Sequence, residues 1–324
     1  MKTHRATTKW LILAVMGALA IAWLIIGLWP RSGMAAPPLW RAHADGAPLV
    51  LAHQGGAMER PSSSDLAFER ASEIGVDAFE LDVVLTADGV LAVIHDTTLD
   101  RTTDGVGPVG DRTYAEIRFL DAGYGLLGED GEVVRDPARN PYIGIGAYVP
   151  SLEELFREYP SMPMLIEIKD LGDRGLASAR ELRRLIDAYG RATTTMVACN
   201  DEEPLLEFDS LPGERVARAA SKPEAYRFYA RHALGLNALN NRAPHEAMSL
   251  SLTSGLGPFT IDLTAERLRR DCVARGLSTM YWTVNDVATM ERLLSMATST
   301  GGIDGIITDR PSELLAALSR RGIR

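Results

Sequence analysis

The sequence predicts an α/β protein with a TIM-type (β/α)8 barrel and one inserted segment, preceded by a single N-terminal transmembrane helix. From residue 49 onward, strand-like runs alternate with helical patterns, which indicates a parallel sheet with crossover helices. The alternating region is about 270 residues long, close to the roughly 250 residues typical of an eight-stranded barrel. A doubly wound open sheet accounts for the same alternation and is the structural alternative.

The predicted transmembrane helix is the uncharged stretch at residues 10–30, WLILAVMGALAIAWLIIGLWP. At about 1.5 Å rise per residue it is long enough for a hydrocarbon core of roughly 30 Å. Three basic residues lie within residues 1–9, and no acidic residue follows the stretch before Asp45. This bias places residues 1–9 in the cytoplasm and the rest of the chain on the extracytoplasmic (periplasmic or extracellular) side. A cleaved signal peptide is the alternative, because small residues follow at 33–36. The uncleaved anchor is favoured, because the apolar run exceeds the ~7–15 residues of a signal-peptide core.

Charge and cysteine content exclude several classes of protein. The chain has 34 basic and 43 acidic residues, a net charge of −9, and no basic stripe, so we expect no nucleic-acid partner. Beyond residue 31 the balance is 30 basic against 43 acidic residues, and this net charge of −13 would be repelled by anionic lipid. Two cysteines, Cys199 and Cys272, are too few for a disulfide-dense scaffold or a multi-thiolate zinc site. Export would permit a disulfide between them, but nothing in the sequence requires one.

A linker rich in Pro, Ala and Gly is expected at 31–47, followed by the barrel domain at 48–320. Nine runs have strand character: 49–53, 78–85, 90–95, 164–169, 193–199, 216–220, 248–252, 279–284 and 303–308. Seven runs have helical periodicity: 65–74, 152–159, 177–189, 223–234, 265–274, 288–296 and 312–318. Ser151 and Glu154 form a capping box at the start of the second of these helices, and Pro311 suits the first turn of the last.

The segment 100–149 interrupts this alternation. It is long, Gly-rich and aromatic, and a connection of this length predicts a functional loop or a small inserted element. Within it, we expect Asp100 and Arg101 to hold the loop through a local ion pair.

Three acidic residues stand within apolar strands. Glu80 and Asp82 are two positions apart in AFELDVVL, so a strand would point both to the same face. Glu167 lies in a second apolar run, LIEIK, with Lys169 on the same face. Burying such carboxylates without a cation is costly, and three of them with water suit Mg²⁺ or Ca²⁺. A salt bridge between Glu167 and Lys169 is the simpler alternative for that pair alone.

Two histidines end strand-like runs: His53 in LVLAH and His95 in VLAVIH. In barrels and open α/β sheets, residues at the C-terminal ends of strands form the active site. Histidine is also the usual proton carrier near neutral pH. We therefore expect these two histidines near the acidic residues.

The motifs together resemble the glycerophosphodiester phosphodiesterase family over about residues 49–315. They occur in the family's order: AHQGG (52–56), ELDV (80–83), HDTTLDRTTDG (95–105), VPSLEEL (149–155), IEIK (166–169), WTVN (282–285) and DGIITDRP (304–311). The resemblance implies a (β/α) barrel, a divalent cation and hydrolysis of glycerophosphodiesters. Several separate motifs in one order make it far more specific than any single motif.

Carried over residue by residue, the resemblance assigns three groups of roles. It makes His53 and His95 the general acid/base pair. It assigns Lys169 to the phosphate and Trp282 to the glycerol end of the substrate. It makes three carboxylates the metal ligands: Glu80, Asp82 and Glu167.

Two positions depart from the family pattern. The family usually has His-Arg-Gly where this chain has His53, Gln54 and Gly55, so the substrate-binding position at Gln54 lacks the positive charge and the bidentate fork of arginine. The family's Pro-Glu-Asn-Thr is replaced by PSSS at 61–64, with Ser62 in place of the glutamate. These changes bear on substrate choice and rate more than on the fold.

The expected function is metal-dependent hydrolysis of glycerophosphodiesters to sn-glycerol 3-phosphate and an alcohol. By resemblance, the glycerol 2-hydroxyl attacks first and water then opens a cyclic phosphate. One alternative is a lysophospholipase D-type or sphingomyelinase D-like enzyme acting on lipid headgroups such as that of a lysophospholipid, because the anchor makes a lipid substrate plausible. Another is a non-catalytic, membrane-tethered binding domain, against which the intact acidic residues and histidines argue.

Overall fold

The structure is a computed structural model that describes residues 16–17, 35–237, 243–256 and 259–323. Within these ranges there is no helix with the length and apolar character needed to cross a membrane. The predicted span at 10–30 lies outside the described residues, apart from Met16 and Gly17.

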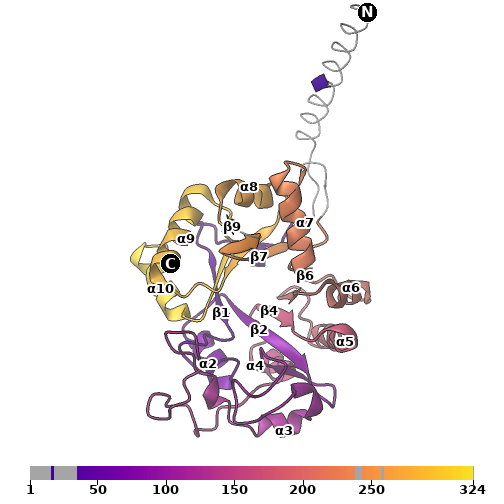
Figure 1. Ribbon diagram of the computed structural model, residues 1–324, viewed down its shortest axis with the longest axis vertical. Helices are drawn as coiled ribbons and strands as arrows, with labels where there is room; N and C mark the ends of the chain where they lie inside the picture. The colour runs from indigo at the N-terminus through magenta and orange to yellow at the C-terminus, as the bar shows by residue number, and fades with distance from the viewer. Residues whose placement is uncertain (1–15, 18–34, 238–242, 257–258, 324) are drawn as a thin grey trace, which may run out of the picture.

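A nearly closed barrel of eight parallel strands forms the described domain, with helices around it (Figure 1). The strand order is β6-β5-β4-β2-β1-β11-β10-β7, and a parallel bridge between Ala219 and Ala247 brings the two edges together. This closure confirms the predicted TIM-type barrel and excludes the open doubly wound sheet. The strands are β1 (Leu49–His53), β2 (Ala78–Leu85), β4 (Met164–Ile168), β5 (Thr195–Cys199), β6 (Ala217–Arg218), β7 (Ala247–Ser251), β10 (Ser278–Trp282) and β11 (Gly305–Thr308).

Each barrel strand is followed by a helix of the outer layer. Ser151 and Glu154 form the predicted capping box at the start of α4, and Pro311 occupies the first turn of α10, as expected. The helices are α2 (Asp65–Glu73), α4 (Leu152–Glu158), α5 (Gly172–Ala188), α6 (Glu202–Ser210), α7 (Lys222–Ala233), α8 (Glu266–Ala274), α9 (Val287–Thr300) and α10 (Pro311–Arg320).

One strand of the sheet runs against the others. β3 (Leu91–Val93) pairs antiparallel with β2, with Val93 opposite Val83 and Leu91 opposite Leu85. The run at 90–95 is therefore not a barrel strand, contrary to the simple strand–helix alternation. The chain continues through the short helices η2 (Val109–Asp111), α3 (Tyr114–Arg118) and η3 (Ala122–Gly125) before it reaches α4.

Along β1, β2 and β4, the side chains inside the barrel change from apolar to titratable. Strand residues two apart face the same way, so the inward positions follow from the sequence. On β1, Leu49 and Leu51 precede His53; on β2, Ala78 precedes Glu80. At the end where the strands begin, the buried ring of Trp40, from η1 (Pro38–Trp40), packs with the apolar layer. The charged layer consequently lies at the opposite end, where the strands finish.

One histidine away from the charged layer is buried, and its ring has no hydrogen-bond partner in the described part of the chain. His245 is 3% exposed, and neither ring nitrogen is hydrogen-bonded. Its Nδ1 lies 3.7 Å from a Glu224 carboxylate oxygen. Burial lowers the pKa of His245 to about 4, and the nearby Glu224 carboxylate only partly offsets this effect.

We expect His245 to make the fold sensitive to mild acid. Its pKa is lower in the folded than in the unfolded chain, so its contribution to stability is complete above about pH 6.5 and is lost as the pH falls toward 4. The shift corresponds to about 3 kcal/mol of unfolding free energy. In urea unfolding at pH 7 and pH 4.5, His245→Gln should lose less stability on acidification than the parent. His43→Gln, at an exposed histidine, is the matched control. Equal pH dependence in His245→Gln and the parent would contradict this expectation.

Candidate active site

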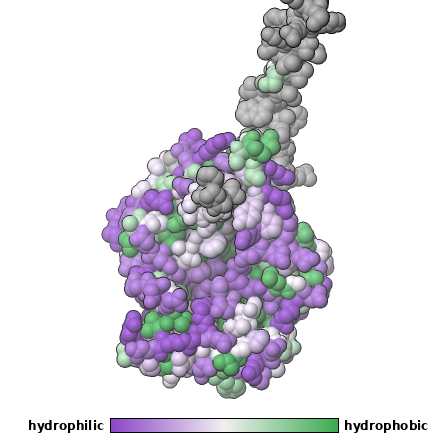
Figure 2. Space-filling view, viewed as in Figure 1, coloured by the Kyte–Doolittle hydropathy of each residue, from purple (hydrophilic) through white to green (hydrophobic). Residues whose placement is uncertain are grey.

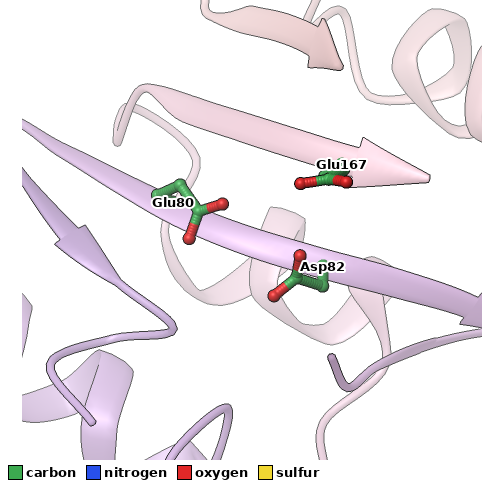
Figure 3. A group of neighbouring side chains, drawn as sticks. All are labelled: Glu80, Asp82 and Glu167. Carbon is green, nitrogen blue, oxygen red and sulfur yellow. The ribbon is translucent and has the colours of Figure 1, made fainter. Parts of the chain in front are cut away.

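The inward-facing positions of β2 and β4 bring three carboxylates together. Glu80 and Asp82 lie two residues apart on β2, and Asp82 is paired in register with Glu167 of β4. One carboxylate oxygen from each of the three residues lies within 4.8 Å of the others. Figure 3 shows the three side chains gathered on one face of the two neighbouring strands. The sequence prediction that Glu80, Asp82 and Glu167 share one site thus agrees with their positions.

The electrostatics of this acidic cluster favour an added cation. Burial and the neighbouring Asp82 charge raise the pKa of Glu80 to about 8, and burial with the same charge raises the pKa of Glu167. Asp82 is 1% exposed, and its Oδ2 has no hydrogen-bond partner among the described residues. Lys169 Nζ lies 2.9 Å from Asp82 Oδ1 and 3.2 Å from Glu167 Oε2, so one ammonium faces three carboxylates. A hard divalent cation fits this set of oxygen atoms and would neutralise the remaining charge.

His53, the last residue of β1, is oriented by a carboxylate from the neighbouring strand end. Its Nδ1 lies 2.6 Å from Oδ1 of Asp309, which follows β11. Asn285 holds Asp309 in turn, because its amide donates to Oδ2 at 2.6 Å and its oxygen accepts from the Asp309 backbone N–H at 2.9 Å. Burial opposes protonation of His53, but Glu80 and Asp309 outweigh it and raise its pKa to about 9.

His95 reaches the site because β3 doubles back. The Ile94 backbone N–H donates to the Asp82 carbonyl at 3.0 Å, which places the next residue, His95, beside the acidic cluster. Its Nδ1 lies 2.6 Å from Asp96 Oδ1, and Arg101 donates to both Asp96 oxygens at 2.7 and 3.0 Å. His95 therefore follows an antiparallel strand and does not end a barrel strand.

The expected ion pair between Asp100 and Arg101 is not the one that forms. Arg101 pairs with Asp96, and Asp100 instead accepts a hydrogen bond from the Gly107 backbone N–H at 3.0 Å. Arg101 consequently supports His95 through Asp96.

Gln54 is packed beside His53 in an unusual backbone conformation. It is 4% exposed, and its φ of 51° lies in the left-handed region, which non-glycine residues seldom adopt. Its amide nitrogen lies 3.3 Å from His53 Nε2, and its amide oxygen accepts a hydrogen bond from the Ser62 hydroxyl. The two positions at which the chain departs from the family pattern are therefore hydrogen-bonded to each other.

A cavity of about 350 Å³ opens at the end of the barrel where the strands finish. Trp282 stands at its rim with 44% of its surface exposed. Asn200 and Ser249 also line the cavity, and the Asn200 amide donates to Glu167 at 2.8 Å. Gln54 does not line the cavity. The other seven of the eight predicted site residues do: His53, Glu80, Asp82, His95, Glu167, Lys169 and Trp282.

Sequence reasoning gave no role to the two carboxylates that orient the histidines. Asp96 and Asp309 both lie inside quoted motifs, HDTTLDRTTDG and DGIITDRP, and each directly follows a strand-like run. The two cysteines are unpaired: Cys199 ends β5 and Cys272 is buried in α8.

A sequence model described as the glycerophosphoryl diester phosphodiesterase family matches residues 53–313. The chain belongs to this family. It is accordingly an enzyme of the phosphodiesterase class. A glycerophosphodiester phosphodiesterase of Caldanaerobacter subterraneus subsp. tengcongensis is 32% identical over 289 residues, which cover 85% of this chain and 98% of that protein. One from Bacillus subtilis is 30% identical, over 81% of this chain and 84% of that protein.

Solved structures support the same fold for this phosphodiesterase. The glycerophosphoryl diester phosphodiesterase domain of a Mycobacterium tuberculosis protein superposes with a TM-score of 0.67 at 22% identity, covering 84% of this chain and 99% of that one. A phosphodiesterase of Oleispira antarctica, solved in complex with the product sn-glycerol-3-phosphate, gives a TM-score of 0.61 at 21% identity, covering 84% and 97%.

Proposed function

We propose that this phosphodiesterase hydrolyses glycerophosphodiesters to sn-glycerol 3-phosphate and an alcohol. One observation carries the proposal: two histidines, each oriented by its own carboxylate, and three clustered acidic residues line one cavity. This arrangement combines a cation site with groups for proton transfer, which are the two requirements for cleaving a phosphate diester.

Glu80, Asp82 and Glu167 would hold the divalent cation, Mg²⁺ or Ca²⁺. When bound, such an ion withdraws electron density from a phosphate oxygen and offsets the charge that develops at phosphorus. The uncompensated Asp82 Oδ2 and the raised pKa values of Glu80 and Glu167 support this role.

His53 and His95 would divide the proton transfers. In both residues Nδ1 faces a carboxylate, so Nε2, which in His53 lies 3.3 Å from the Gln54 amide nitrogen, is the nitrogen that would face a reacting group. One histidine takes the proton of the glycerol 2-hydroxyl as its oxygen bonds to phosphorus, and the other protonates the departing alcohol oxygen. Water then opens the resulting cyclic phosphate, with the two proton transfers reversed.

Substrate contacts would come from three further residues. Lys169 places an ammonium next to the acidic cluster and would contact the phosphate. Trp282, exposed at the rim, would cover the glycerol end of the substrate. Gln54, beside His53 Nε2, would offer an amide hydrogen bond in place of the arginine fork. The uncharged stretch at 10–30 would anchor the enzyme to a membrane, with this domain on the extracytoplasmic side.

Release of glycerol 3-phosphate from glycerophosphocholine by the purified full chain tests the function. We expect release with Mg²⁺ or Ca²⁺, and loss of release in EDTA that is restored by adding the ion back. A lysophospholipid offered in parallel distinguishes the alternative enzyme. Release of a headgroup alcohol from the lysophospholipid, without cleavage of the deacylated diester, would replace this proposal with a phosphodiesterase acting on lipids. No cleavage of either substrate would favour a binding domain.

A further inference from the structure

The described chain enters the barrel at the end where the strands begin. The Ala36 backbone N–H donates to the Gly276 carbonyl at 2.9 Å, and Arg41 donates to the Leu277 carbonyl at 3.0 Å. Gly276 and Leu277 connect α8 to the start of β10. With Trp40 fully buried, these bonds fix Ala35 at this end of the domain.

Four exposed apolar side chains belong to segments at this end of the barrel. Leu39 lies in η1, Leu234 and Leu236 follow α7, and Val273 ends α8. All four precede the start of a barrel strand, and Asn237 ties the segment after α7 to α8 through a 2.6 Å hydrogen bond to Asp271. We call these four residues the anchor-side patch; their exposed fractions are 40%, 71%, 38% and 51%. Figure 2 shows hydrophobic side chains at the upper end of the molecule, over the upper end of the helix that Figure 1 labels α7.

The sequence before this point limits how far the patch can be from a membrane. The uncharged stretch ends at Pro30, five residues before Ala35. Even fully extended, five residues reach only about 17 Å. A chain anchored through residues 10–30 therefore keeps the anchor-side patch next to the bilayer surface, at a high effective concentration.

We propose that the anchor-side patch docks on the lipid bilayer and that the active-site cavity consequently opens away from it. This inference rests on the membrane anchor in the proposed function. Transfer of exposed leucine and valine side chains from water into the interfacial region of a bilayer is favourable. The anchor-side patch thus contacts the same membrane that holds the anchor.

The orientation selects a class of substrate. The cavity lies at the other end of the strands, and a strand of five residues is about 17 Å long. A lipid in the same bilayer would have to lift its acyl chains out of the hydrocarbon to bring its phosphate there, at about 0.8 kcal/mol for each CH₂ group exposed. The substrate is therefore a water-soluble diester without acyl chains.

A second set of exposed apolar residues offers the opposite orientation and must be tested against the first. Val106, Phe119 and Ile145 lie between β3 and α4, on the cavity side, and Phe119 is 90% exposed. In the described part of the chain, the segment that leads toward the predicted anchor bonds to Gly276 and Leu277, at the opposite end of the barrel. Docking through Phe119 would turn the cavity toward lipid.

Fluorescence quenching on the full chain in phosphatidylcholine vesicles decides between the two faces. An environment-sensitive thiol fluorophore is attached to Leu236→Cys, Val273→Cys or Phe119→Cys, and spin-labelled phosphatidylcholine is the quencher. Cys199 and Cys272 are buried, so the unsubstituted chain should take up little label and serves as the background control. We expect several-fold stronger quenching at positions 236 and 273 than at 119.

Stronger quenching at position 119, or equal quenching at all three positions, would overturn the proposal. The readout is independent of catalysis: strong quenching at 236 and 273 in a protein without diesterase activity would retain the docking face and reject the proposed function. For the substrate class, we expect the vesicle-bound chain to cleave added glycerophosphocholine and not phosphatidylcholine of its own bilayer. Cleavage of that lipid would reject the orientation.

Discussion

Asp82→Asn is expected to lower the turnover of glycerophosphocholine by about 10³-fold, because it removes one of the three charged oxygen ligands. Loss of a cation that stabilises charge at phosphorus removes several kcal/mol, and each 1.36 kcal/mol is a factor of ten in rate. Without metal, the Asp82→Asn variant should nevertheless be no less stable to unfolding than the parent. Asp82 is buried beside two other carboxylates with one ammonium nearby, so neutralising it relieves repulsion.

Thermal unfolding with and without metal checks this expectation separately from activity. A cation at 100 times its dissociation constant stabilises the folded state by about 2.7 kcal/mol, so the melting temperature of the parent should rise with Mg²⁺ or Ca²⁺ and fall in EDTA. In Asp82→Asn this metal-induced shift should be largely lost. Asp173→Asn, at an exposed acid in the first turn of α5, is the matched control and should keep the full shift. An unaltered shift and rate in Asp82→Asn would show that the acidic cluster is not the cation site.

The barrel was predictable because its strands carry their own pattern. Runs such as AFELDVVL and MLIEI have the apolar, β-branched character of strands buried on both faces. Because strand residues two positions apart face the same way, Glu80 and Asp82 could be placed on one face from the sequence. The same rule explains why Glu167 and Lys169 share a face. Local sequence was sufficient wherever a functional side chain belonged to a barrel strand.

Three elements depended on information that local patterns do not contain. α6 contains Pro204, which normally argues against a helix, but here it occupies the third position, where its missing N–H needs no partner within the helix. The hairpin of β8 (Thr253–Leu256) and β9 (Phe259–Asp262) is too short for a clear alternation. The direction of β3 follows from its pairing with β2, which the run at 90–95 does not reveal.

The partners of the histidines illustrate the same limit. Asp309 lies 256 positions after His53, and only the closure of the barrel by β11 against β1 brings them together. Asp96 directly follows His95, yet its link to Arg101 depends on the fold of the loop. Sequence reasoning found the groups that face the cavity and missed those that orient them.

Alanine at either histidine is expected to lower turnover by about 10²–10⁴-fold, the usual contribution of a positioned general acid or base. His53 and His95 have separate proton transfers in the proposed scheme, and each is held at Nδ1 by its own carboxylate, so neither should replace the other. Both variants should keep the far-ultraviolet circular dichroism and the metal-induced stabilisation of the parent. His43→Ala, at an exposed histidine bonded to Asp77, should retain full activity.

The nature of the leaving group then separates the two roles. A diester of glycerol phosphate with p-nitrophenol releases a stable phenolate that needs no protonation, so loss of the general acid should cost little with this substrate. Loss of the general base should remain costly, because the glycerol hydroxyl must still give up its proton. We therefore expect one histidine variant to regain most of its rate on the nitrophenyl diester and the other to stay impaired. Near-normal turnover of glycerophosphocholine by both variants would remove the histidines from the mechanism, and equal behaviour on the two substrates would exclude a division into acid and base.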